Sequence, residues 1–553
     1  MTAVQQRIGW IFGLFLGLLV IAGARTAYLG VIRGAALRKA ASTQQVTDEK
    51  VMAPRGTITD RNGVELAVSE PARDVSADPY LLKDPLSTAH QLAPLLGQSE
   101  AAVLRKLSEH TGFVYLARSM PGGEAARVLA LKIPGVTGTP VMRRVYPRGQ
   151  LASQVLGVVG TEGTGLDGLE YSRNTQLGGH SGERRVVSDA IGQPVSITEP
   201  HPESAGQPLA LTLDANIQQR SEDVLAAVAR VFQPRDATAI VMDPNSGALL
   251  AVANWPQVNP NDLAAAPAGG LTDRAVSFDY EPGSTFKAVT VSGALQDGLV
   301  TPQSSFNIPD QIHIADRTIH DDTEHAEETL TTAQILARSS NVGAIKIGGL
   351  EGASGFNTWV HRFGFGEPTG VDLPGEERGL TLALSHYSGS SMGNLPIGQG
   401  ELVTPMQMAT AYAAIANGGI LRRPHIVARV GGKPQPVPAG RRVVSQATAA
   451  SLREMLEGVL APGGTASEVS IPGYALAGKT GTASKIDPTT HEYSKTAYVA
   501  SFIGFAPASH PKLLCAVVVD EPQTGSIFGG SVAAPAFGQI MSFALPYMGI
   551  APG

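Results

Sequence analysis

Residues 280–290 read YEPGSTFKAVT, and the lysine at position 287 in this stretch gives the first indication of both the fold and the chemistry. Pro282 and Gly283 break the chain, and a helical pattern then continues through VSGALQDG. No other charged residue occurs in this pattern before Asp297, and its remaining faces are apolar. A helix that is apolar on most sides lies in the centre of a domain, so the sequence predicts a buried lysine.

A buried lysine must either find polar partners or lose its proton. Ser284 lies one turn before Lys287 on the same predicted helical face. An uncharged amine beside a hydroxyl is a general base beside a nucleophile. The start of the helix would also favour negative charge that develops at Ser284. The pair therefore predicts a serine acyl-transfer enzyme.

Ser-x-x-Lys alone is weak evidence, because residues 509–512 (SHPK) match it in a connection broken by proline. Two more motifs strengthen the prediction. SSN at residues 339–341 follows a helical stretch, and we prefer it to SFN at residues 305–307, which follows Pro302 in a loop-like segment. KTGT at residues 479–482 lies on a predicted strand, where lysine and threonine can bind a carboxylate and glycine permits close approach of another backbone.

The surrounding pattern predicts an α+β domain. Residues 237–254 give two apolar runs around Pro-Asn-Ser-Gly, which is typical of a β-hairpin. Three further strands are expected at residues 474–482, 497–507 and 512–522, followed by a closing helix at 531–545. Strands at both ends with helices between them indicate a central antiparallel sheet flanked by helices. The Pro/Gly-rich residues 200–208 suit a domain boundary, so we predict one module over 40–205 and a second over 208–550.

The N-terminus predicts a membrane anchor. Residues 8–24 are uncharged and apolar, and a second apolar piece extends the predicted anchor to residue 32, after a tail of residues 1–7. Ala22-Gly23-Ala24 also fits the processing site of a cleaved signal peptide, the alternative to a retained anchor. Most basic residues near the anchor lie on its C-terminal side, which by itself would place the large domain in the cytoplasm. That rule is weak for long translocated domains, so the chemistry must decide the orientation.

Composition excludes several classes of protein. A net charge of -6 over 553 residues, without long basic blocks, argues against nucleic acid as a partner. The single cysteine, Cys515, excludes an intrachain disulfide and a cysteine-based zinc site, and its apolar neighbours predict a buried position.

Ser-x-x-Lys, Ser-x-Asn and Lys-Thr-Gly, in this order, resemble the signature of the penicillin-binding protein and serine β-lactamase superfamily. The resemblance extends along the chain. PRGTITDRNG at residues 54–63 is similar to the opening of the N-terminal module of class B penicillin-binding proteins, and IGQGELVTPMQMA at 397–409 and GGSVAAPAF at 529–537 are similar to their transpeptidase domain. YEPGSTFK preceded by DRAV resembles the division-type (septal) enzymes more than the elongation type.

This resemblance implies an elongated mixed α/β pedestal, similar to a dimerisation module, and a peptidoglycan D,D-transpeptidase. Ser284 would attack the penultimate D-Ala of a stem peptide ending in D-Ala-D-Ala, and Lys287 would take its proton. Ser339 would relay that proton to the leaving amine, and Asn341 would hold Lys287. The other implied site residues are Lys479, Thr480, Gly481 and Thr482 for the substrate carboxylate, with the backbone N–H groups of Ser284 and Thr482 as the oxyanion hole.

The resemblance also implies the setting of the reaction. The substrate lies outside the membrane, so the chain would be single-pass in the cell (inner) membrane with its catalytic domain extracytoplasmic. β-lactams would acylate Ser284, and the implied partners are a SEDS-type membrane glycosyltransferase and cell-division proteins. No metal or organic cofactor is implied.

Alternative readings remain. A β-lactamase or a penicillin-sensing protein would use the same serine, although no glutamate that activates water for deacylation can be identified. The chain could also act mainly as a scaffold for the glycosyltransferase.

GSSMG at residues 389–393 fits a hydrolase elbow, but Pro396 breaks the helix that an elbow needs. The histidines and aspartates of residues 313–325 could suggest a metal site, but their irregular spacing favours a solvated loop.

Overall fold

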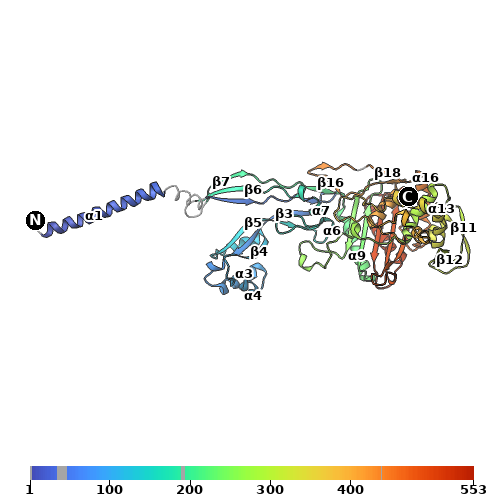
Figure 1. Ribbon diagram of the computed structural model, residues 1–553, viewed down its shortest axis with the longest axis horizontal. Helices are drawn as coiled ribbons and strands as arrows, with labels where there is room; N and C mark the ends of the chain where they lie inside the picture. Colours follow the sequence, from blue (N-terminus) through green and yellow to red (C-terminus); the bar gives the residue numbers. More distant parts are fainter. Residues whose placement is uncertain (1–2, 34–45, 189–193, 438, 553) are drawn as a thin grey trace. The chain divides into compact units, whose positions relative to one another are not determined.

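The computed structural model describes residues 3–33, 46–188, 194–437 and 439–552. The chain forms two compact units. The smaller contains residues up to 54, 71–142 and 179–205, and the larger contains residues 55–70, 143–178 and 206–553. The catalytic motifs all lie in the larger unit, which is coloured from green to red over most of its length in Figure 1.

The N-terminal segment is a single apolar helix. Helix α1 (Ala3–Ala27) continues into a short π-helical turn, η1 (Tyr28–Ile32). Its large side chains are exposed, with Trp10 82% accessible. Within the described residues, 7–32 is the one helical stretch that is long and apolar enough to cross a membrane, by length and composition.

The smaller unit combines two sets of strands with three helices. β1 (Val46–Val51), β6 (Gly182–Ser188) and β7 (Pro194–His201) form an antiparallel sheet with β6 in the middle. From Ala72 onward β3 (Glu65–Ala77) pairs with β4 (Val114–Pro121), and β5 (Val136–Val145) also pairs with β3. The helices are α3 (Pro85–Leu96), α4 (Glu100–Leu107) and α5 (Gly122–Leu129), whose buried side chains share one core with β3 and β4.

The larger unit is built on the predicted antiparallel sheet. Its five strands run in the order β10 (Leu249–Trp255), β9 (Asp236–Met242), β21 (Leu513–Asp520), β20 (Tyr493–Ala506) and β19 (Ala477–Ile486). All four neighbouring pairs are antiparallel. The predicted hairpin at 237–254 and the three predicted later strands are therefore confirmed.

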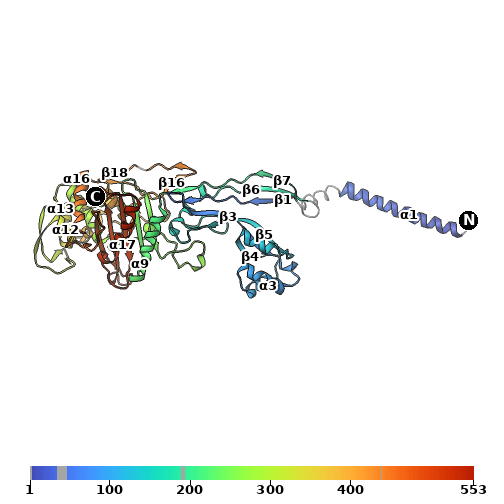
Figure 2. The same cartoon turned by 180° about the vertical axis from the view of Figure 1, so that it is seen from behind.

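Both faces of this sheet are buried. In β21, Leu514, Ala516 and Val518 belong to one apolar cluster, and Cys515 and Val517 to another. This alternation explains why the strand reads as an uninterrupted apolar run, and it confirms the buried position of Cys515. Helices α9 (Ala215–Phe232) and α17 (Gly529–Tyr547) cover the second cluster and lie beside each other, as Figure 2 shows.

The opposite face carries the catalytic helices. α11 (Lys287–Gln296) packs against α13 (Asn341–Arg362) and α16 (Gln446–Glu457), while α15 (Pro405–Ala416) packs on β21. The first eight residues of α11 are all buried, which confirms the predicted central helix. One detail differs. Ser284 lies in a 3-10 turn, η4 (Gly283–Phe286), and the α-helix begins only at Lys287, because Gly283 has a φ of +53° and Thr285 bonds back to the carbonyl of Pro282.

A buried ionic cluster holds the PRG segment inside the larger unit. Glu170, on α7 (Gly168–Ser172), is fully buried and forms ion pairs with Arg55 and Arg144, the latter at 2.6 Å. Arg55 also donates to the Glu170 carbonyl at 2.6 Å and to Asn174 Oδ1 at 2.8 Å. The carboxylate therefore satisfies two guanidinium groups that are themselves almost inaccessible to water.

We expect Glu170→Ala to lower the free energy of unfolding of the larger unit by about 3–5 kcal/mol, because two guanidinium groups would remain buried without their carboxylate. The thermal unfolding midpoint of the detergent-solubilised chain, followed by circular dichroism, measures the effect. Asp48→Ala is the control, since Asp48 pairs with Arg185 on an exposed surface and its loss should leave the midpoint almost unchanged. An unchanged midpoint for the Glu170 variant would contradict the expectation.

Candidate active site

The turn that carries Ser284 is fixed on several sides. Gly283 donates from its N–H to the carbonyl of Gly398 at 3.0 Å, and the hydroxyl of Tyr412 on α15 donates to the carbonyl of Thr285 at 2.7 Å. Thr285 and Phe286 are buried, whereas Ser284 is half-buried. The fold therefore presents one hydroxyl of a rigid turn at an accessible surface.

Lys287 is fully buried and satisfies its ammonium with uncharged oxygens. Its Nζ donates to the carbonyl of Ser339 at 2.5 Å, to Asn341 Oδ1 at 2.6 Å and to Ser339 Oγ at 3.3 Å. The partners come from the connection between α12 (Thr332–Arg338) and α13, as predicted for the SSN motif. Ser339 lies there in the left-handed region, with a φ of +64°.

Lys479 reaches the same hydroxyl from the sheet. It lies on β19, is fully buried, and donates from Nζ to Ser339 Oγ at 2.9 Å and to the Thr480 carbonyl at 3.1 Å. The Ser339 hydroxyl thus lies between two lysine amines. A hydroxyl in this position can pass a proton from one group to another.

Burial shifts the proton affinity of both lysines. It lowers the pKa of Lys287 to about 8, against the opposing effect of Asp322 and Asp321, which favour the charged form. The pKa of Lys479 falls well below its ordinary value, first because of burial and second because of the positive charge of Lys287. The predicted effect of burial on Lys287 is confirmed. The repulsion between the two amines lowers the pKa of Lys479.

The KTGT strand lies directly against the Ser284 turn. A Cβ on Gly481 would be 2.9 Å from Thr285 Cγ2 and 3.0 Å from the Pro282 carbonyl, so only glycine permits this approach. Thr482, the next residue on the strand, also packs against this turn. A Cβ on Gly283 would lie 3.0 Å from the carbonyl oxygen of Thr482. The hydroxyl of Thr482 accepts a hydrogen bond from the N–H of Gly529, and that of Thr480 lies 2.7 Å from Thr465 Oγ1.

β19 is also an edge strand. Among the described strands of the sheet it stands at the end of the order and pairs with β20 alone. An edge strand presents unpaired backbone groups that another extended chain can use.

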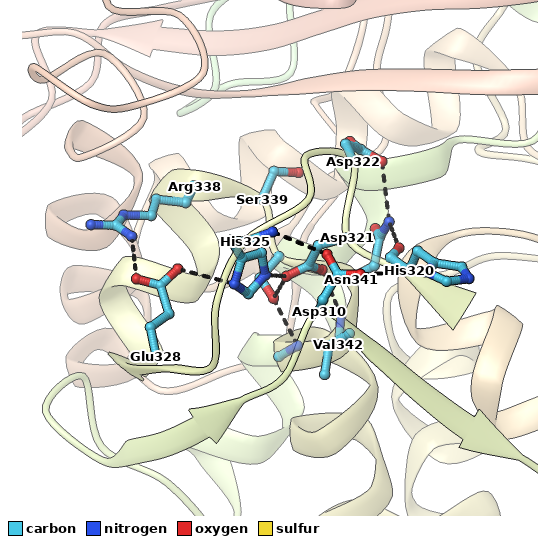
Figure 3. A network of polar contacts seen from close by, with 12 residues as sticks. Asp310, His320, Asp321, Asp322, His325, Glu328, Arg338, Ser339, Asn341 and Val342 are labelled. Atoms are coloured by element: carbon cyan, nitrogen blue, oxygen red, sulfur yellow. Dashed lines mark hydrogen bonds and ion pairs between the residues drawn. The ribbon is translucent and has the colours of Figure 1, made fainter. Parts of the chain in front are cut away.

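Sequence reasoning missed the segment that follows β13 (Arg317–His320). Asn341 donates from Nδ2 to the carbonyl of His320 at 2.9 Å and to Asp322 Oδ1 at 3.2 Å. Asp321 accepts from Ser340 Oγ at 2.8 Å and from the N–H of Val342 at 2.9 Å, as Figure 3 shows. The interpretation of residues 313–325 as a solvated stretch holds for most of their side chains, which are exposed. What it left out is that β13 belongs to a hairpin and that the half-buried Asp321 contacts the SSN motif. No spacing in the sequence links residues 320–322 to residues 339–341, so only the fold reveals the contact.

The rival motifs lack the geometry that they need. Ser391 of GSSMG begins the four-residue helix α14 (Ser391–Asn394), and a 3-10 turn rather than a strand precedes it. SFN at 305–307 lies on β11 (Ser305–Ile308), a strand rather than the expected loop. In the ranges that the structure describes, no three histidine, cysteine or carboxylate side chains are arranged to hold a metal ion.

The predicted site residues form two sets of contacts. Hydrogen bonds join Lys287, Ser339, Asn341, Lys479 and Thr480, and tight backbone contacts bring Gly481 and Thr482 to the turn of Ser284. A nucleophilic hydroxyl, a buried amine and a relay hydroxyl are the parts that serine acyl transfer requires.

Comparison with known proteins agrees with this geometry. Residues 237–542 match the penicillin-binding protein transpeptidase domain, and residues 50–211 match the penicillin-binding protein dimerisation domain. The chain is 34% identical to the peptidoglycan D,D-transpeptidase FtsI of Escherichia coli K12, over 99% of this chain and 93% of that protein. It is 32% identical to the penicillin-binding protein PbpB of Mycolicibacterium smegmatis, over 96% of this chain and 88% of that protein.

Solved structures give the same result. The crystal structure of penicillin-binding protein 3 from Mycobacterium tuberculosis, complexed with aztreonam, matches with a TM-score of 0.72 and 29% sequence identity, over 91% of this chain and 98% of that chain. The resemblance drawn from the three motifs is confirmed. Since the transpeptidase match alone spans more than half of the residues, the chain belongs to the class B penicillin-binding proteins.

Proposed function

We propose that this chain cross-links peptidoglycan as a serine D,D-transpeptidase, with stem peptides ending in D-Ala-D-Ala as donors. The observation that carries the proposal is the Ser339 hydroxyl held between the amines of Lys287 and Lys479, beside the turn of Ser284. This arrangement supplies a base, a proton relay and a nucleophile within one water-poor site. The names of the relatives, peptidoglycan D,D-transpeptidase among them, support the same reaction.

The first half-reaction forms an acyl-enzyme. Ser284 Oγ attacks the carbonyl of the penultimate D-Ala while neutral Lys287 accepts the hydroxyl proton. Ser339 passes a proton to the nitrogen of the terminal D-Ala as the amide bond breaks, and that D-Ala leaves as a free amine. The backbone N–H groups of Ser284 and Thr482 stabilise the oxyanion, an interaction typically worth about 3–4 kcal/mol per donor.

The second half-reaction transfers the acyl group. An amine of a neighbouring stem peptide attacks the ester of Ser284, its proton returns through Ser339 and Lys287, and the serine hydroxyl is restored. Asn341 keeps Lys287 in place throughout. A β-lactam takes the place of the donor, and its ring-opened acyl group stays on Ser284.

Lys479, Thr480 and Thr482 bind the terminal carboxylate of the donor. Lys479 has a lowered pKa when its pocket holds no anion, and an arriving carboxylate would favour its charged form. Gly481 lets the donor backbone lie along the free edge of β19 as an added strand. Binding of the carboxylate and protonation of Lys479 are thus coupled.

The setting follows from the substrate. Helix α1 anchors the chain in the cell membrane as a single span, with residues 1–7 inside and the chain from residue 46 onward outside, where peptidoglycan lies. The similarity to division-type enzymes supports a septal role in which α1 and the smaller unit contact a SEDS-family glycosyltransferase and cell-division proteins.

Treatment of the full chain with penicillin should add one drug molecule, and the adduct should lie on Ser284, because that hydroxyl is the nucleophile. Intact-mass and peptide mass spectrometry locate it. Ser284→Ala should abolish the adduct, whereas Ser391→Ala, in the rival GSSMG motif, should keep it. An adduct on another residue, or sustained hydrolysis of a chromogenic cephalosporin after the first turnover, would overturn the transpeptidase assignment.

The acylation rate should rise with pH through about 8. Burial lowers the pKa of Lys287 to about 8, and only the neutral amine accepts the serine proton, so at one pH unit below this value about a tenth of the enzyme is competent. The second-order rate constant for a fluorescent penicillin, measured from pH 6 to 9.5, gives the profile. Lys287→Arg, which keeps its proton over this range, should acylate at least about a hundredfold more slowly. A flat wild-type profile would contradict a lysine base.

The membrane setting gives one more expectation. Alkaline phosphatase fused to the C-terminus should be active, because that reporter folds only outside the cytoplasm. In a second experiment, a photo-crosslinker in place of the exposed Trp10 of α1 should trap the glycosyltransferase. The same crosslinker at Leu131, on the surface of the smaller unit, is a comparison position. An inactive fusion would contradict the orientation, and a crosslinked α1 that traps no glycosyltransferase would contradict the partner.

A further inference from the structure

The amide of Asn341 has two chemically different ends, and the structure fixes which end faces the lysine. Its Oδ1 accepts from Lys287 Nζ at 2.6 Å, while its Nδ2 donates to the His320 carbonyl at 2.9 Å and to Asp322 Oδ1 at 3.2 Å. An amide nitrogen cannot accept a hydrogen bond, so two acceptors on one side select the orientation that offers Oδ1 to Lys287. Asp322 therefore acts on Lys287 through Asn341.

The neighbouring carboxylate holds the backbone of the same motif. Asp321 accepts from Ser340 Oγ at 2.8 Å and from the N–H of Val342 at 2.9 Å, and Ser340 Oγ in turn accepts from the N–H of Gly343. Ser339 has a φ of +64°. This conformation is energetically unfavourable for any residue that carries a side chain, and it persists only where the surrounding structure enforces it. Asp321 supplies that enforcement at Ser340 and Val342, one and three positions after Ser339.

His325 supports Asp321 from its other side. His325 Nε2 lies 3.1 Å from Asp321 Oδ2, and Figure 3 shows the imidazole between Asp321 and Glu328. Glu328 forms an ion pair with Arg338 at 2.8 Å, at the end of α12. The segment 320–328 is thus tied to both helices that border the SSN motif.

Both carboxylates also act on the lysines by charge. Asp322 and Asp321 raise the pKa of Lys287 against the effect of burial, and Asp322 does the same for Lys479. The charged groups that face Lys287 are therefore these two aspartates from the segment after β13 and Lys479 from β19. The other charged or titratable groups nearby face away from Lys287. His320 lies 3.7 Å from Asp310, His325 contacts Asp321 and Glu328, and Glu328 pairs with Arg338 on α12.

We propose that Asp322 and Asp321 are positioning residues for acyl transfer: Asp322 orients the Asn341 amide toward Lys287 and places a negative charge behind that amide, and Asp321 holds the turn of Ser339 and Asn341. The inference rests on the proposed roles of Lys287 and Asn341 and adds an acidic partner to them. The carboxylates offset part of the burial effect, so Lys287 keeps enough basicity to take a proton from a serine hydroxyl. A residue that merely packed the loop would affect folding without moving the pH profile.

Three variants test the proposal through the pH profile of penicillin acylation. Asp322→Asn keeps an oxygen for Asn341 Nδ2 but removes the charge, so the rising limb should move to lower pH by about half a unit, the size expected for one partly screened charge. Asp322→Ala also removes the acceptor, so the plateau rate should fall about five- to thirtyfold. Glu324→Gln is the matched control, an exposed carboxylate on the same segment, and its profile should overlay the wild type.

Asp321→Asn tests the second residue. It replaces an oxygen that accepts from Ser340 by an amide nitrogen that cannot accept, so the plateau should fall while the thermal midpoint shows that the chain remains folded. Unchanged profiles and plateaus in the Asp322 and Asp321 variants would overturn the inference. Loss of the adduct in Ser284→Ala and Lys287→Ala, with no effect of the aspartate variants, would leave the proposed function intact. Normal acylation of Lys287→Ala would instead overturn the function on which the inference rests.

Discussion

The burial of Lys287 is the constraint around which the larger unit is arranged. An amine without water must donate its hydrogen bonds to protein, and all three of its bonds go to uncharged oxygens of Ser339 and Asn341. A carboxylate in direct contact would satisfy the lysine better, but would also keep it protonated. The site instead places its acidic groups one residue away, behind the Asn341 amide. Lys287 can therefore make its hydrogen bonds to protein and still give up its proton.

Close backbone packing provides the second condition for the site. The nucleophile turn and the KTGT strand belong to different layers, and they approach so closely that Gly481 and Gly283 have no room for larger side chains. Helix α15 supports the turn from behind through Tyr412. The positions of Ser284 and of the strand that receives substrate are thus set by main-chain contact, which tolerates less movement than side-chain contact. Preorganisation of this kind reduces the reorganisation that a reaction would otherwise require.

Much of this arrangement was predictable because its signals are local. The strands at residues 237–254 and 477–520 are recognisable from apolar runs and turn residues, and a lysine in an apolar helix indicates its own burial. The SSN motif was recognisable because a helical stretch precedes it. The contribution of Asp321 and Asp322 was not predictable, since carboxylates in a polar stretch look solvated until the fold brings α13 against them. The 3-10 turn at Ser284 is held in place by the hydrogen bond from Gly283 to Gly398, a partner more than a hundred residues away that no local pattern indicates.

The order of strands in the sheet has a consequence for biosynthesis. β9 is made early, yet one of its two neighbours is β21, which emerges from the ribosome only after some 270 further residues. Until then β9 keeps an open edge, and β19, which carries Lys479, is made before the strand that joins its side of the sheet to β9. A chain interrupted anywhere before about residue 520 therefore lacks the centre of its sheet, so a truncated product is expected to be a substrate for proteolysis instead of a partly active enzyme.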